Sequence, residues 1–144
     1  MIIKLIGWLL FLAFVHALWE IQIESKAGWA RHLPTFRVNT FLTKLLIGKE
    51  ITGYHLYMLL FLITIFHGIF LFRPFSWRTE ATVFGLFCWY FIIEDFLWFV
   101  LNKHYRLWNF KKGKITWHKR WIFGLPVSYW WGMILGIFLL IIGR

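Results

Sequence analysis

Four apolar runs, each long enough to cross a lipid bilayer as a helix, alternate with polar stretches along the chain. We expect helices at about residues 2–19, 51–72, 81–102 and 122–143, since a spanning helix needs about 20 apolar residues. Gly132 and Gly136 form a small-xxx-small pair, which permits close contact between helices. The pattern predicts an all-α fold, an integral membrane four-helix bundle that forms one domain over residues 1–144.

Two long polar connections join the predicted helices, from Glu20 to Glu50 and from Lys103 to Arg120. The first contains the segment Phe36 to Ile47, where apolar and basic residues mix, so we expect a short amphipathic helix on the membrane surface. In the second connection, aromatic residues are interspersed with seven basic residues. This pattern is typical of a segment in the headgroup layer, with rings buried and charges reaching water.

The composition supports a membrane protein and narrows the partners. Hydrophobic residues make up 60% of the chain, against about 45–50% in soluble domains. The single cysteine, Cys88, excludes an intrachain disulfide and a cysteine metal motif. The net charge of +10 comes from basic residues that flank apolar runs, so we expect membrane lipids and no nucleic acid as partners. Four short helices leave a small bundle, so a homo-oligomer or a larger membrane complex is a further prediction.

The distribution of basic residues predicts an orientation. Four crossings place both long connections on one side, which then carries twelve lysines and arginines, while the other side carries four. The positive-inside rule then makes both connections cytoplasmic and puts both termini outside. We expect the chain to lie in the plasma membrane.

Two adjacent acids, Glu94 and Asp95, interrupt the third apolar run. An acid at the centre of a spanning helix costs about 2.5–3.5 kcal/mol on insertion scales, and such residues usually face a bundle interior and mark function. His16 and Glu20 share one face of the first helix because they are four residues apart, and His55 enters the second helix near the same surface. We therefore expect one polar site at the cytoplasmic end of the bundle.

The first hypothesis for this site is a divalent metal centre. Imidazole and carboxylate together suit Zn, Fe or Mn, and helix bundles build such sites from residues on facing helices. The candidate metal ligands, or their immediate neighbours, are His16, Glu20, His55, Glu94 and Asp95.

The second hypothesis is acid–base chemistry without a metal, with Glu94 and Asp95 as the catalytic residues. Two adjacent acids in a dry helix favour the neutral form of one of them, which could then donate a proton. The stretch Ile93-Glu94-Asp95-Phe96-Leu97-Trp98-Phe99 resembles the acidic stretch of the membrane-integral lycopene cyclases, with Asp95 in place of a second Glu. The resemblance implies cyclisation of a carotenoid by protonation.

Further alternatives stay open. The acids could pair with His55 or with loop cations and so fix helix packing in a non-catalytic subunit or scaffold. A haem between His16 and His55 is a weaker hypothesis, because acids suit an apolar macrocycle pocket badly.

A last candidate lies in the second connection. His118, Lys119 and Arg120 could fold back under the bundle and bind the phosphate or carboxylate of a headgroup, or they could remain a solvated contact with lipid. Together these patterns predict a small membrane enzyme that acts on a lipid or isoprenoid substrate entering from the cytoplasmic leaflet.

Overall fold

The computed structural model describes residues 2–46 and 49–144 and is mostly helical. The elements in chain order are α1 (Ile2–Glu24), β1 (Arg37–Val38), α2 (Phe41–Leu46), β2 (Ile51–Thr52), α3 (Gly53–His67), η1 (Gly68–Leu71), α4 (Trp77–Leu101), η2 (Leu107–Asn109), β3 (Trp121–Ile122), β4 (Leu125–Pro126) and α5 (Val127–Ile142). In the described part of the chain, α1, α3 together with η1, and α4 are long and apolar enough to cross a membrane, and α5 is a shorter apolar helix. Of the four predicted spanning helices, three have the expected length and the fourth, α5, is shorter, and this set of apolar helices is typical of an integral membrane protein.

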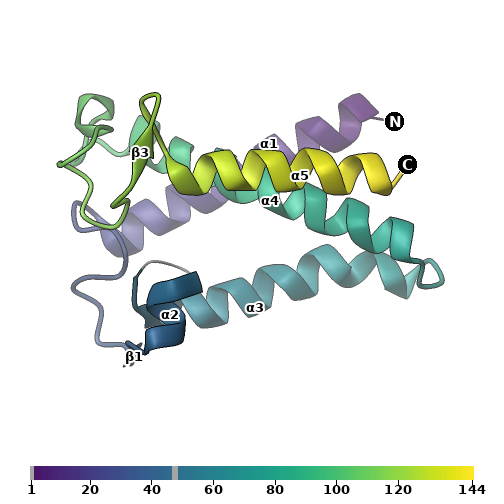
Figure 1. Cartoon of the computed structure of the whole chain (residues 1–144), viewed down its shortest axis with the longest axis horizontal. Coiled ribbons are helices and arrows are strands. Elements are labelled where there is room, and N and C mark those ends of the chain that lie inside the picture. The colour runs from purple at the N-terminus through teal and green to yellow at the C-terminus, as the bar shows by residue number, and fades with distance from the viewer. Residues whose placement is uncertain (1, 47–48) are drawn as a thin grey trace.

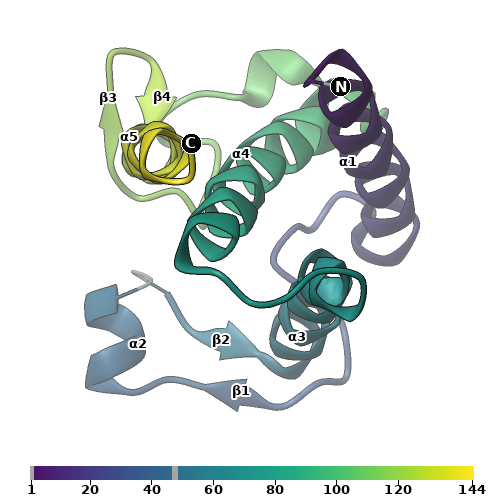
Figure 2. The same ribbon diagram turned by 90° about the vertical axis from the view of Figure 1, so that its right-hand side faces the viewer.

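Helix α4 lies at the centre of the fold, with α1 and α5 packed along its two sides and α3 below it in the view of Figure 2. One core cluster joins three helices, through Leu9 and Ala13 of α1, Leu62 of α3, and Phe87 of α4. Gly136 brings α5 close to α4, since a Cβ at this position would lie 2.9 Å from the Trp89 ring. The predicted close contact at this glycine is therefore present.

The helix ends differ from the prediction where side chains find partners inside the fold. Helix α1 continues past Trp19 to Glu24, because Glu20 and Glu24 are buried against other helices and are not solvated. Helix α3 begins at Gly53, where the side chain of Thr52 accepts a hydrogen bond from the backbone N–H of His55.

The last helix also begins later than predicted. Residues 121–126 form a hairpin in which β3 pairs with β4, and its turn holds Phe123 and Gly124 at positive φ. The predicted surface helix from Phe36 is shortened to α2, because β1 pairs with β2 in front of it. Ile47, the predicted end of that helix, lies outside the described residues.

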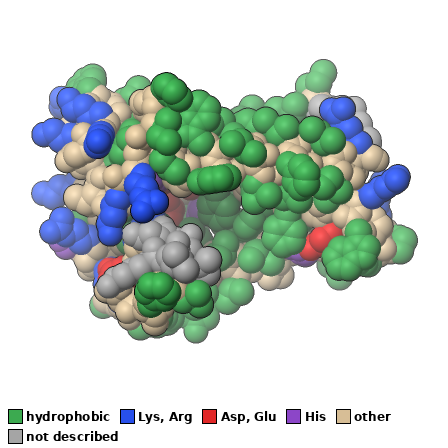
Figure 3. Space-filling view, viewed as in Figure 1, with side chains coloured by type: hydrophobic (Ala, Val, Ile, Leu, Met, Phe, Trp, Pro, Cys, Tyr) green, Lys and Arg blue, Asp and Glu red, His purple; other side chains and the backbone are tan. Residues whose placement is uncertain are grey.

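Both long connections lie at one end of the molecule, and the two termini lie at the other (Figure 1). Most of the lysine and arginine side chains visible in Figure 3 gather at the end with the connections, while hydrophobic side chains cover the middle of this face. Which compartment either end faces remains a prediction from the charge distribution.

Candidate functional site

A cavity of about 450 Å³ lies between α3 on one side and α4 and α5 on the other. Its apolar wall comes from residues such as Met58 and Leu59 of α3 and Phe91 and Ile92 of α4. Its polar wall comes from carboxylates and histidines of α1, α3, α4 and the second long connection. The cavity therefore combines space for an apolar molecule with a set of groups that can carry chemistry.

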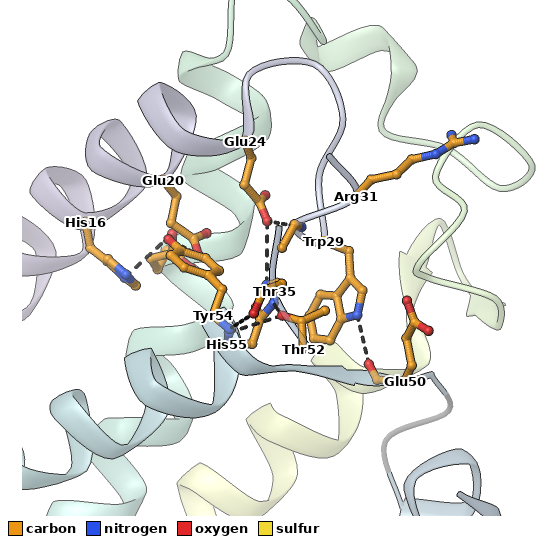
Figure 4. A network of polar contacts seen from close by, with 12 residues as sticks. His16, Glu20, Glu24, Trp29, Arg31, Thr35, Glu50, Thr52, Tyr54 and His55 are labelled. Carbon is orange, nitrogen blue, oxygen red and sulfur yellow. Dashed lines mark hydrogen bonds and ion pairs between the residues drawn. The ribbon is translucent and has the colours of Figure 1, made fainter. Parts of the chain in front are cut away.

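The first polar group consists of Glu20 and Glu24 of α1 and His55 of α3 (Figure 4). One ligand atom from each residue lies within 4.8 Å of the others, and both glutamates are buried. The Nε2 atom of His55 is 3.6 Å from Oε1 of Glu24, and the hydroxyl of Tyr54 donates to Oε1 of Glu20 at 3.3 Å. Two carboxylates and one imidazole form a donor set that suits Zn, Fe or Mn and leaves positions open for a further ligand.

Two neighbours fix the orientation of His55. Its Nδ1 atom is 2.7 Å from the hydroxyl of Thr52, so Nε2 is the ring nitrogen that faces the glutamates. The ring stacks on Trp29 at a centroid distance of 3.9 Å. A histidine that binds a metal through one nitrogen normally engages the other in such a hydrogen bond, which fixes the tautomer and the ring orientation.

The segment after α1 adopts backbone conformations that are rare for residues with side chains. Ser25, Trp29 and Ala30 have φ values of 54°, 59° and 50°. This backbone directs the N–H of Ala30 to Oε1 of Glu24 at 2.5 Å. Left-handed conformations at ordinary residues cost energy and cluster at functional sites. Here they position one carboxylate of the first group.

The second polar group joins α4, the second connection and α5. Oδ2 of Asp95 lies 3.0 Å from Nε2 of His118 and accepts a hydrogen bond from the hydroxyl of Tyr129. The indole N–H of Trp121 donates to the carbonyl of His118 at 2.7 Å and so stabilises the local turn that presents His118. A carboxylate, an imidazole and a phenol in one chain of hydrogen bonds can hold or move a proton.

The third polar group lies one turn further along the helices. Nδ1 of His16 is 2.8 Å from the hydroxyl of Tyr90 and 3.8 Å from Oε1 of Glu94. Glu94 and Glu20 both line the cavity, which connects this group to the first. In the described residues, Oε1 of Glu94 is buried and has no hydrogen-bond partner. A buried carboxylate oxygen without a partner is costly, so Glu94 is suited to a further ligand or proton.

A lysine closes the polar wall on the side of the connections. The Nζ atom of Lys49 lies 3.1 Å from the centre of the Trp29 ring, on which it makes a cation–π contact. Burial lowers the pKa of Lys49 to about 8, although the carboxylates of Asp95, Glu24 and Glu20 act in the opposite direction. The charge of this ammonium, which lines the same cavity as the acids, therefore responds to pH near neutrality.

The structure distributes the predicted site residues over three adjacent groups. Glu20 and His55 meet each other, His16 meets Glu94, and Asp95 meets His118. His16 and His55, the pair considered for a haem, have different partners, since His55 contacts the end of α1 and His16 contacts Tyr90. Glu80 and His67, which belong to none of the three groups, pair at 3.0 Å at the opposite end of the molecule.

The sequence pattern missed several residues of the site. Trp29 reads as an interfacial anchor, but it forms the face against which His55 stacks. Nothing in the sequence indicated that Lys49 and Tyr129 belong to the site, since a lysine beside a helix and a tyrosine in an apolar run are both common. Glu24 was indicated only by its four-residue spacing from Glu20, which puts both on one face if the helix continues, and α1 does extend to Glu24. Of the predicted headgroup residues, His118 faces Asp95, while Lys119 and Arg120 are exposed.

The comparisons with known proteins found no family model, no curated protein and no solved structure that matches this chain.

Proposed function

We propose that this chain is an integral membrane enzyme that binds a divalent metal and acts on a lipid-like molecule held in the cavity. The observation that carries the proposal is the group of Glu20, Glu24 and His55 on the wall of a largely apolar cavity of about 450 Å³. A lipid-like molecule suits this cavity, because apolar side chains form most of the lining and the polar groups that could carry chemistry gather on one wall.

The roles follow from the three polar groups. Glu20, Glu24 and His55 hold the metal, which would polarise a carbonyl or phosphoryl oxygen or activate a water molecule. Asp95 and His118 hold or move a proton at the cavity wall. Glu94 supplies either a further ligand or a proton, because its Oε1 atom has no hydrogen-bond partner in the described part of the chain.

In the membrane, we place the chain as a bundle of four crossing helices with both long connections on the cytoplasmic side. The substrate then enters the cavity from the inner leaflet, between α3 and α5. Charge supports this orientation, since the connections carry most of the basic residues.

Metal analysis of the purified protein tests the proposal. We expect about one Zn, Fe or Mn ion per chain in the wild type, as at other three-ligand sites. His55→Gln should lose most of this metal, whereas His67→Gln should keep it. The two residues form a matched pair, because both lie in α3 and both contact a carboxylate. A wild-type protein without metal, or equal loss in both variants, would refute the metal centre.

Two other functions are each favoured by one observation. A non-catalytic subunit is favoured by the contacts of Asp95, since they tie the second connection and α5 to α4 and could serve packing alone. Protonation of an alkene without a metal is favoured by the buried oxygen of Glu94 that has no hydrogen-bond partner among the described residues.

The double substitution Glu94→Gln and Asp95→Asn separates these functions. Lipid extracts of cells that express the wild type should contain a product that is absent from cells with the double variant, while both proteins assemble equally. If the variant only unfolds and no lipid changes in either strain, the subunit is favoured. If the product persists after complete metal removal, the metal-free chemistry is favoured.

A further inference from the structure

A second recess, of about 310 Å³, adjoins the cavity on the side of the connections. Four cationic side chains line it, namely Arg31, Arg37, Lys49 and Lys119, together with the single acid Glu50. Gly28, Asn39 and Thr116 add backbone or side-chain polar groups to the lining. The two long connections, far apart in the sequence, therefore both contribute positive charge to one open recess.

The recess and the cavity share a wall. Trp29, Lys49 and Trp117 line both spaces. The ring of Trp29 stacks on His55 at a centroid distance of 3.9 Å, and the ammonium of Lys49 lies 3.1 Å from the centre of the same ring. One indole ring therefore separates the metal-binding group from the cation. A molecule with its apolar part in the cavity would place its head beside this ring.

The cations of the recess differ in how far they are already paired. Arg37 bonds to the carboxylate of Glu50 at 2.5 Å and to the carbonyl of Ala30 at 2.6 Å, so it serves mainly to hold the first connection in place. Arg31 and Lys119 are exposed and make no ion pair with any described residue. Figure 4 shows the Arg31 side chain pointing away from Glu24, on the side of the connection remote from the metal-binding group.

The balance of charge indicates the class of ligand. Among the described residues, pairing of Arg37 with Glu50 leaves Arg31 and Lys119 without an acid partner in the recess, while the ammonium of Lys49 also feels the carboxylates of the adjoining cavity. A carboxylate would bring one negative charge, whereas a phosphate monoester brings about −1.5 to −2 and three acceptor oxygens. Arginine and lysine are the side chains that bind phosphate most strongly.

We propose that the recess binds the phosphate head of an anionic lipid whose apolar chains occupy the adjoining cavity. The inference rests on the proposed function, since it names the substrate class of that same site. It assigns phosphate binding to Arg31, Lys49 and Lys119, with Trp29 and Trp117 separating the head from the chains. Arg120, which lines neither space, has no part in it.

Calorimetric titration of the purified protein in detergent micelles tests the proposal with three probes. Dioctanoyl phosphatidate carries both parts of the ligand, dioctanoylglycerol carries the chains alone, and glycerol phosphate carries the head alone. We expect phosphatidate to bind at least about tenfold more tightly than either fragment, because charged hydrogen bonds and apolar burial add.

Two double variants show where the head binds. Arg31→Gln with Lys119→Gln should weaken phosphatidate binding about tenfold or more and leave dioctanoylglycerol binding and metal content unchanged. Lys111→Gln with Lys112→Gln removes the same charge from exposed residues of the second connection that line neither space, and it should change affinity less than about twofold.

The outcomes separate the inference from the proposed function. Equal losses in both double variants would overturn the inference, since the basic end would then attract anionic surfaces in general. Glycerol phosphate binding as tightly as phosphatidate would also overturn it, because the ligand would be a soluble phosphate. Selective, recess-dependent phosphatidate binding by a protein that holds no metal would support the inference and refute the metal enzyme.

Discussion

Glu24→Gln is the most direct perturbation of the proposed metal centre. The amide keeps an oxygen that can accept the hydrogen bond from the N–H of Ala30, so the segment after α1 retains its anchor. The substitution removes the negative charge that faces Nε2 of His55. We therefore expect the fold to survive and metal binding to fail.

The expected size of the effect follows from linkage between binding and unfolding. A metal at a hundred times its dissociation constant stabilises the folded state by about 2.7 kcal/mol. At about 2–4 °C per kcal/mol for a chain of this length, the wild type should melt about 5–10 °C higher with metal. Loss of a residue that merely orients a ligand costs about 10–100-fold in metal affinity, so loss of a ligand should cost at least about a hundredfold. The same metal concentration would then stabilise Glu24→Gln by about 0.4 kcal/mol, which is about 1 °C.

Tryptophan fluorescence during thermal melting measures both shifts, with Zn²⁺, Mn²⁺ and Fe²⁺ added in turn to metal-free protein. Glu80→Gln is the matched control, because Glu80 also contacts a histidine but lies at the opposite end of the molecule. It should keep the full shift of the wild type. The reasoning is refuted if Glu24→Gln shows the same shift as the wild type, or if Glu80→Gln loses it.

Three further predictions concern charge, packing and the second connection. Phosphate binding should weaken as pH rises through about 8, because Lys49 then loses its proton, whereas Lys49→Arg should bind equally well from pH 7 to 9; calorimetry across this range measures it. Gly136→Ala should lower the free energy of unfolding by about 1–3 kcal/mol, since its Cβ would meet Trp89, whereas Gly7→Ala, with open space around it, should raise it slightly; denaturant unfolding in micelles compares them. Asp95→Asn should weaken the contact with His118, because it removes the negative charge of the pair. The loss should be about 1–2 kcal/mol, since the Asp95 side chain is partly exposed, and trypsin should then cleave the second connection faster.

For each of these three predictions, one result would contradict the reasoning. A falling affinity in Lys49→Arg over the same pH range would show that another group titrates. Equal stability changes at Gly136 and Gly7 would mean that α5 does not pack closely on α4. Unchanged proteolysis of Asp95→Asn would show that the Asp95–His118 contact does not hold the connection in place.

The amino-acid sequence predicted the helices well and their ends less well. Apolar runs of spanning length are a local property, so α1, α3 and α4 could be recognised without tertiary information. The end of α1 could not, because Glu24 is helical only where other parts of the chain bury it. Residues 121–126 read as the start of a helix, but they pair with each other as β3 and β4.

The sequence by itself determined that two acids interrupt the apolar helix α4 and that histidines of α1 and α3 occur near the same end. Acids in such a helix usually face a polar site, because a charge in apolar surroundings is costly. Only the tertiary structure decided which groups meet, since Glu24 with His55 and Asp95 with His118 join residues of different segments. The roles of Trp29 and Lys49 are likewise invisible in sequence, because they depend on the left-handed backbone after α1 and on the return of the chain at β2.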